Sequence, residues 1–155
     1  MLYYHIVKKD DEVGSSTYLR IDGTDYYYEA NFDKSMPELN LSNEKVRDEI
    51  KDIMKFWLDM GVSGFRLDAI KYYDTGGDDG QEFCKWLVDT AKGIKKDAYI
   101  VGENWSGTSQ IADWYSTGID SQFNFPMSQA IGTYETAVRS GDANKLCKSV
   151  KSWGE

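Results

Sequence analysis

The sequence is poor in the residues that build disulfide frameworks, metal centres and membrane spans. Its 155 residues include only two cysteines, Cys84 and Cys147, and one histidine, His5. The cysteines lack metal-ligand spacing and cannot make a disulfide framework, so we interpret them as free thiols. No apolar run approaches the ~18 residues of a transmembrane helix. We therefore expect no metal ligands among these side chains and no membrane partner.

Basic residues are also in the minority. Lys and Arg number 18 against 26 Asp and Glu, which gives a net charge of −8. A negative chain repels phosphate backbones, so we expect no nucleic-acid partner. A neutral substrate such as a sugar is compatible with this charge. The 11 Tyr, 5 Trp and 6 Phe residues suit the apolar faces and polar edges of pyranose rings, although an aromatic-rich small sheet explains them equally well.

The first third of the chain and the rest have different patterns. Residues 1–36 are broken repeatedly by turn residues, and short strands are expected around 17–21 and 26–29. From residue 42 onward, apolar residues recur at helical spacing up to Met60, with Ser42 as the expected N-cap and Gly61 as the stop. Residues 1–36 are therefore interpreted as a loop-rich excursion and the remainder as a regular α/β unit.

Helices and strands alternate through the rest of the sequence. Asp79 with Glu82 forms a capping-box pattern at the start of the second predicted helix. The expected strands cover residues 62–68, 98–103 and 119–125, and the expected helices cover 79–94, 108–115, 126–138 and 144–153. Such alternation indicates βαβ units and a parallel sheet. The pattern alone leaves an open sheet and a barrel as alternatives.

Two of the predicted strands end in carboxylates, Asp68 and Glu103. The two residues lie 35 positions apart, which is the length of one strand–helix–strand unit. Active sites of parallel α/β sheets form at the carboxyl ends of strands. Neighbouring strand ends lie about 4.8 Å apart, close to the ~5–5.5 Å between the carboxyls of retaining glycosidases and below the roughly 6.5–9.5 Å of inverting ones. Adjacent strands would thus favour a retaining mechanism.

The two carboxyls need opposite protonation states in such a mechanism. Strand alternation places Arg66 on the same face as Asp68, where it would keep Asp68 ionised. Glu103 has Val101 at the matching position, so we expect an apolar setting near Trp105 to raise its pKa. Taken separately, an Arg-x-Asp on a strand is usually an ion pair, and a Gly-Glu at a strand end usually has no role. Only the pair at this spacing indicates catalysis.

Three segments resemble one enzyme family. Residues 61–71, which read Gly-Val-Ser-Gly-Phe-Arg-Leu-Asp-Ala-Ile-Lys, closely resemble the nucleophile strand of the α-amylase family of glycoside hydrolases. Residues 101–105 resemble its acid/base strand, and residues 36–40 resemble the motif that ends the long loop after its third barrel strand. The resemblance implies a partial (β/α)₈ TIM barrel, covering about strands four to six. Residues 1–36 would be the tail of the inserted loop-rich domain, and residues 37–155 the central part of the barrel.

The resemblance also implies roles for individual residues. Asp68 would be the nucleophile, Glu103 the acid/base, and Arg66 the residue that orients the nucleophile. Lys71 and Tyr72 would line the acceptor side of the cleft, although the family often has His where Tyr72 stands. Trp105 would be a stacking platform for sugar, with packing as the alternative. The implied activity is hydrolysis of α-glucosidic bonds in starch-like glucans or maltooligosaccharides by a retaining double displacement.

Two family motifs have no counterpart in the sequence. One is an earlier strand motif with Asp and His at its end, and the other is a later Asn-His-Asp motif that carries the third catalytic carboxylate. A whole barrel needs roughly 250 residues, so we expect this chain to be a piece of one and to hydrolyse starch weakly or not at all by itself. A structural calcium is expected only in a full-length protein, with Asp22 and Asp25 as candidate ligands or, more often, turn residues. The alternatives are a transglycosylase or isomerase of the same family, and a non-catalytic carbohydrate-binding fragment.

Overall fold

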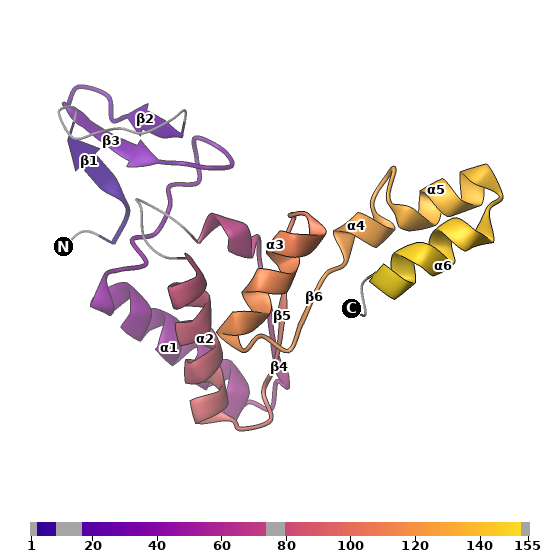
Figure 1. Cartoon of the computed structure of the whole chain (residues 1–155). Coiled ribbons are helices and arrows are strands. Elements are labelled where there is room, and N and C mark those ends of the chain that lie inside the picture. The colour runs from indigo at the N-terminus through magenta and orange to yellow at the C-terminus, as the bar shows by residue number, and fades with distance from the viewer. Residues whose placement is uncertain (1–2, 9–16, 74–79, 153–155) are drawn as a thin grey trace.

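The computed structural model describes residues 3–8, 17–73 and 80–152. The N-terminal part forms an antiparallel sheet in the order β1-β3-β2, at one side of the molecule in Figure 1. Strands β2 and β3 lie where the sequence predicted strands, and β1 is added to them. The bounds are Ile6–Lys8 for β1, Tyr18–Arg20 for β2 and Tyr26–Glu29 for β3.

The segment that leaves this sheet runs back along its first residues. The amide of His5 donates to the carbonyl of Glu38 (2.9 Å), and the amide of Asn40 donates to the carbonyl of Tyr3 (2.8 Å). The amide of Glu38 in turn donates to the carbonyl of Glu29 at 2.8 Å. These backbone bonds hold residues 38–40 against the small sheet before the chain enters its first helix.

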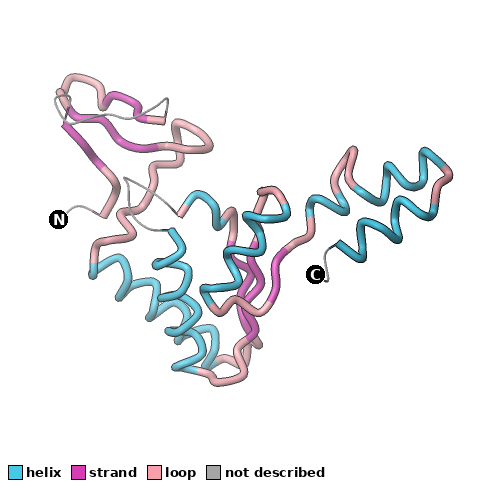
Figure 2. The backbone as a smooth tube through the Cα atoms, in the orientation of Figure 1, coloured by secondary structure: helices cyan, strands magenta, loops and turns pink. Residues whose placement is uncertain are grey.

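The second part of the structure is a parallel sheet in the order β4-β5-β6, as the alternation of helices and strands predicted (Figure 2). The strands are β4 (Gly64–Leu67), β5 (Tyr99–Gly102) and β6 (Ser121–Gln122). The last of these is much shorter than the predicted strand over 119–125. Helices α1 (Glu44–Asp59), α2 (Gly80–Ile94) and α3 (Thr108–Asp113) lie on one side of these strands in Figure 1.

The core lies between this sheet and its helices. Helix α1 contributes Met54 and Leu58, and helix α2 contributes a larger set that includes Phe83 and Leu87. The predicted apolar face of α1 is only partly buried, because Ile53 and Trp57 are exposed. The start of α1 also differs from the prediction. Asn43, not Ser42, is the N-cap, because the Asn43 side chain accepts a hydrogen bond from the amide of Lys45 at 3.0 Å. The Asp79 cap predicted for α2 lies outside the described residues.

Two short 3₁₀ helices connect these elements. They are η1 (Ile70–Tyr72), directly after the end of β4, and η2 (Trp114–Thr117), which follows α3. The chain leaves η2 through Gly118, which takes a left-handed conformation with a φ of 82°. In the register of the parallel strands, Leu67 of β4 pairs with Gly102 of β5. The residues that follow these two positions therefore emerge at the same edge of the sheet.

The prediction of one helix over residues 126–138 is wrong. The structure has α4 (Phe125–Ser128) and α5 (Thr133–Ser140), and α6 (Ala143–Ser152) follows. The chain turns between α4 and α5 because Ile131 takes a left-handed conformation with a φ of 64°. Helices α5 and α6 form a hairpin that extends away from the parallel sheet in Figure 1. Ile131, which precedes the hairpin, and Val138 of α5 were expected in the single helix over 126–138, and both side chains are exposed.

Candidate active site

The carboxyl ends of β4 and β5 bring Asp68 and Glu103 together. The amide of Glu103 donates to the carbonyl of Leu67 at 2.8 Å, and the amide of Ile70 donates to the carbonyl of Glu103 at 2.9 Å. These bonds continue the parallel pairing one residue beyond the strands. The two acidic residues thus leave neighbouring strands at one edge of the sheet, which is the arrangement that their spacing predicted.

Arg66 lies between the two carboxyls and forms an ion pair with each. One of its terminal nitrogens contacts Asp68 Oδ1 and the other contacts Glu103 Oε2. The Asp68 side chain is 75% exposed, whereas that of Glu103 is 15% exposed. The site therefore has one open carboxylate and one sheltered carboxylate, held in position by a single guanidinium.

The prediction of a raised pKa for Glu103 is wrong. Burial acts in that direction, but it is outweighed by hydrogen bonds with the Trp105 indole, the Asp68 carboxyl and the Ala69 amide, and by the charge of Arg66. Together these partners hold the pKa of Glu103 below its usual range. The sequence reasoning took Val101 and Trp105 as an apolar setting. It missed that the Trp105 indole donates to Glu103 and that the Arg66 guanidinium reaches Glu103 from the neighbouring strand.

The backbone after Asp68 takes an unusual conformation. Ala69 is left-handed, with φ 43° and ψ 46°, and it caps the 3₁₀ helix η1. A residue with a Cβ costs roughly 1–2 kcal/mol in this conformation. The turn aims the amide of Ala69 at Glu103 Oε2, at 3.3 Å. The strain at Ala69 thus accompanies a direct link between the two strand ends.

The remaining predicted residues lie around these carboxyls. The Lys71 ammonium donates to the carbonyl of Trp105 at 3.0 Å and lies over the ring of Tyr72, 4.8 Å from its centroid. Tyr72 meets Phe32 edge to face, with ring centroids 4.8 Å apart. Trp105 stacks on Phe125 with centroids 3.5 Å apart, so Phe125 covers one face of the predicted sugar platform.

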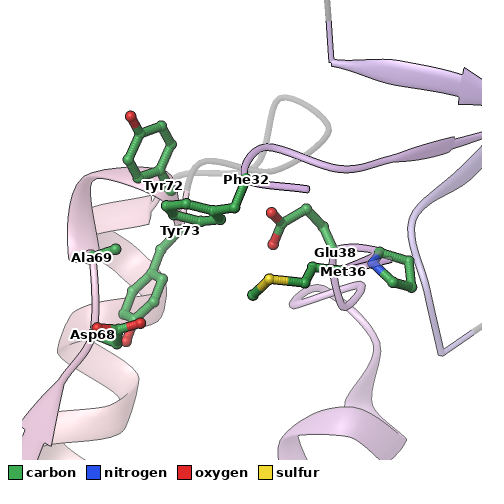
Figure 3. A pocket seen from close by; sticks show the side chains of 8 residues that line it. Phe32, Met36, Glu38, Asp68, Ala69, Tyr72 and Tyr73 are labelled. Carbon is green, nitrogen blue, oxygen red and sulfur yellow. The ribbon is translucent and has the colours of Figure 1, made fainter. Parts of the chain in front are cut away.

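A pocket of about 250 Å³ opens beside Asp68 (Figure 3). One wall comes from Ala69, Tyr72 and Tyr73 after β4, and the other comes from Phe32 and the segment 36–38. Burial raises the pKa of Tyr73, so its hydroxyl stays protonated at neutral pH. Residues 36–38 belong to the motif at 36–40, which the sequence analysis linked to the family but to no pocket. No sequence signal pointed to Phe32 or Tyr73.

Comparison with known proteins assigns the fold and family. The family model described as "Alpha amylase, catalytic domain" matches residues 10–153. The chain belongs to the α-amylase family. The family fold is a (β/α)₈ barrel, and the parallel sheet with its helices is a part of such an architecture.

The α-amylase family relatives of this chain are much longer than the chain itself. Alpha-amylase 3 of Dictyoglomus thermophilum is 49% identical over 111 residues, covering 70% of this chain and 21% of the relative. An oligo-1,6-glucosidase of Bacillus cereus is 51% identical over 49 residues, covering 32% of this chain and 9% of the relative. The solved Eubacterium rectale protein Amy13B superposes with a TM-score of 0.89 at 38% identity, covering 98% of this chain and 30% of that protein. The chain thus spans less than a third of each of these family members.

Asp22 and Asp25, the two candidate calcium ligands, both lie within the described part of this α-amylase family chain. Within residues 3–8, 17–73 and 80–152, no three acidic, cysteine or histidine side chains lie together. Of the two candidate ligands, Asp25 faces Arg20, whose Nη2 lies 3.5 Å from Asp25 Oδ1. A guanidinium beside a carboxylate competes with a cation for it. In the same described ranges, no helix is long and apolar enough to cross a membrane.

Proposed function

We propose that this chain forms the catalytic centre of a retaining α-glucoside hydrolase, within a complete barrel whose fourth to sixth strands are β4, β5 and β6. The observation that carries the proposal is the placement of Asp68 and Glu103 at the ends of two hydrogen-bonded parallel strands, with Arg66 between them. Retaining glycosidases require two carboxyls close enough to act on one anomeric carbon without an intervening water. Paired neighbouring strands supply that closeness.

Asp68 is the proposed nucleophile. Its exposed carboxylate borders the pocket in Figure 3, and its ion pair with the Arg66 guanidinium fixes the position of the carboxylate. In the first step a carboxylate oxygen of Asp68 bonds to the anomeric carbon while the glycosidic bond breaks. Glu103 gives its proton to the departing oxygen. In the second step Glu103 takes a proton from water, the water oxygen bonds to the same carbon, and the bond to Asp68 breaks.

The charge state of Glu103 in the free site suits the second step. Its lowered pKa describes a carboxylate ready to accept a proton. The first step needs the protonated acid. A sugar that fills the site removes water and competes for the Arg66 guanidinium, and both changes raise the pKa of Glu103. This reversal of roles during one cycle is what an acid/base residue requires.

The relatives and the pocket both support the proposed substrate class. Relatives named alpha-amylase, glucan 1,6-α-glucosidase and oligo-1,6-glucosidase support α-linked glucose polymers or oligomers such as maltooligosaccharides as substrates. The aromatic wall of Phe32, Tyr72 and Tyr73 suits a pyranose ring, as do the hydroxyls of its tyrosines. Lys71 and Tyr72 are the proposed contacts on the acceptor side, and Trp105 is a proposed contact through its free face.

A second candidate is an isomerase or transglycosylase that uses the same covalent intermediate. It is favoured by a trehalose synthase of Pimelobacter that is 40% identical over 80 residues, 51% of this chain and 13% of that enzyme. The two reactions differ only in whether water or a sugar hydroxyl attacks the intermediate. Product analysis separates them, since free glucose or shorter oligomers indicate hydrolysis and a new disaccharide linkage indicates transfer.

The test is made in a protein that contains this chain within a complete barrel. The first product is expected to keep the α-configuration when it is followed by NMR before mutarotation, and a β-product would remove Asp68 from its role. With Glu103→Gln and a glucosyl fluoride, which needs no acid, a covalent adduct is expected on Asp68 by mass spectrometry. Asp68→Asn should lose more than about 10³-fold in kcat and form no adduct. Asp59→Asn, a carboxylate of α1 paired with Lys55, is the matched control and should retain activity.

A further inference from the structure

Trp105 makes three contacts that fix its position next to Glu103. Its indole Nε1 donates to Glu103 Oε1 at 3.0 Å. Its ring stacks on Phe125 with an interplanar angle of 13°, and its carbonyl accepts the Lys71 ammonium. A side chain that served only as a sugar platform would need none of the polar contacts. The indole is instead held with its single donor on one oxygen of the acid/base carboxyl.

The two oxygens of Glu103 have different partners. Oε2 contacts Arg66 and accepts the amide of Ala69, and both of these groups belong to the β4 strand end. Oε1 accepts the indole of Trp105, which comes from the segment after β5 itself. The carboxyl plane is therefore set from both sides. Removal of the indole donor would leave Oε1 without the neutral partner that stabilises its charge.

We propose that Trp105 is a positioning residue that acts through Glu103, with its indole N–H setting the orientation and the protonation midpoint of that carboxyl, and with Phe125 as the support that holds the indole in place. This inference rests on the proposed acid/base role of Glu103. Lys71 assists from the other side by fixing the backbone of Trp105.

The charged groups around Glu103 determine the direction of the expected effect. Arg66 and Asp68 face it from the β4 end, and Lys71 reaches Trp105 from η1. On the aromatic side of the site, Phe123 meets Phe125 edge to face, and the Arg66 guanidinium lies 5.8 Å from the centroid of the Phe123 ring. Arg66 remains in place when Trp105 is changed, so Glu103 keeps its cationic partner. Loss of the indole donor alone should then shift the Glu103 titration to higher pH.

The experiment follows the Glu103 carboxyl directly. The chain is labelled with carboxyl-¹³C glutamate, and the Glu103 signal is assigned as the one that Glu103→Gln removes. Trp105→Phe keeps an aromatic ring on Phe125 but removes the donor, and the Glu103 midpoint should rise by about one pH unit. Trp57→Phe is the matched control, because Trp57 is 46% exposed and Trp105 is 48% exposed. Trp57 lies on α1, away from both carboxyls, and its substitution should leave the midpoint unchanged.

A second variant and a second readout keep the outcomes distinct. Phe125→Leu keeps the indole donor but removes the ring that supports it. This variant should raise the Glu103 midpoint by a smaller amount than Trp105→Phe. If Trp105→Phe does not fold, Phe125→Leu tests the positioning role alone. In a complete barrel, the alkaline limb of kcat/KM should move with the NMR midpoint. If the midpoint shifts but the complete barrel shows no turnover even without a substitution, the proposed hydrolase is overturned and the positioning role stands. An unshifted midpoint in both variants, or a shift equal to that of Trp57→Phe, would overturn the positioning role.

Discussion

Two regions of the molecule differ in how much of each is buried. One is the parallel sheet with helices α1 and α2, and the other is the C-terminal hairpin of α5 and α6. Helix α2 alone has six buried residues, whereas among the described residues α5 has only Ala137 and α6 has none. The candidate active site lies at the edge of the buried region. Its geometry therefore depends on packing that single substitutions can disturb, while the hairpin depends on local turns and helix propensity.

The largest expected effect comes from the contact between β4 and β5. A Cβ added at Gly64 would lie 1.8 Å from the carbonyl oxygen of Tyr99, so Gly64→Ala must push the paired strands apart. We expect a loss of more than about 4 kcal/mol in the free energy of unfolding, measured by urea titration. The same change would separate Asp68 from Glu103, because their strand ends are paired through this register.

Gly93→Ala supplies the matched control within the same region. Gly93 lies in α2 with open space around the position of an added Cβ. Alanine is more favourable than glycine in a helix by about 1 kcal/mol, so this variant should be slightly more stable. If Gly64→Ala were tolerated as well as Gly93→Ala, the close parallel pairing of β4 with β5 would be wrong, and with it the adjacency of the two carboxyls.

An effect of intermediate size on the free energy of unfolding distinguishes the buried region from the hairpin. The test makes the same Val→Ala substitution once in each region. Val88 of α2 is 2% exposed and Val138 of α5 is 81% exposed. Val88→Ala removes two buried methyl groups and should cost about 2 kcal/mol of unfolding free energy. Val138→Ala removes little buried surface and improves helix propensity, so its effect should stay within about 0.5 kcal/mol. Equal losses at the two positions would mean that the hairpin is buried against something in solution.

The same difference in burial explains which predictions from the sequence succeeded. The order of helices and strands around Asp68 and Glu103 followed from apolar periodicity, because that periodicity reflects real burial of residues such as Leu58 and Leu87. The adjacency of the carboxyls then followed from the rule that places such strands in parallel. The pKa of Glu103 could not be predicted in this way, because the Trp105 indole turns its donor onto the carboxyl and Arg66 reaches it across the sheet and not along one strand.

Periodicity misled the prediction in the hairpin, where it does not reflect burial. Ile131 and Val138 have the spacing of one helical face, yet both are exposed. The signal for the break was Gly132, where a Cβ would lie 2.7 Å from the carbonyl oxygen of Gln129 and 2.8 Å from that of Met127. Phe32 and Tyr73 had no signal at all, because they reach the pocket through the packing of the N-terminal segment against η1.

The smallest expected effect tests the turn that ends the false helix. Ile131 is 87% exposed and left-handed, a conformation that disfavours a β-branched side chain. Ile131→Gly should relieve that strain, offset partly by the greater freedom of glycine in the unfolded chain, and stabilise the hairpin by about 0.5 kcal/mol. Val138→Gly, at a similarly exposed position inside α5, should instead destabilise it by a similar amount. Amide hydrogen exchange of α5 measures both, because it reports the local opening of the hairpin separately from unfolding of the sheet. Faster exchange in Ile131→Gly would show that residues 129–132 do not form this turn, and a continuous helix over 126–138 would then again be the better description.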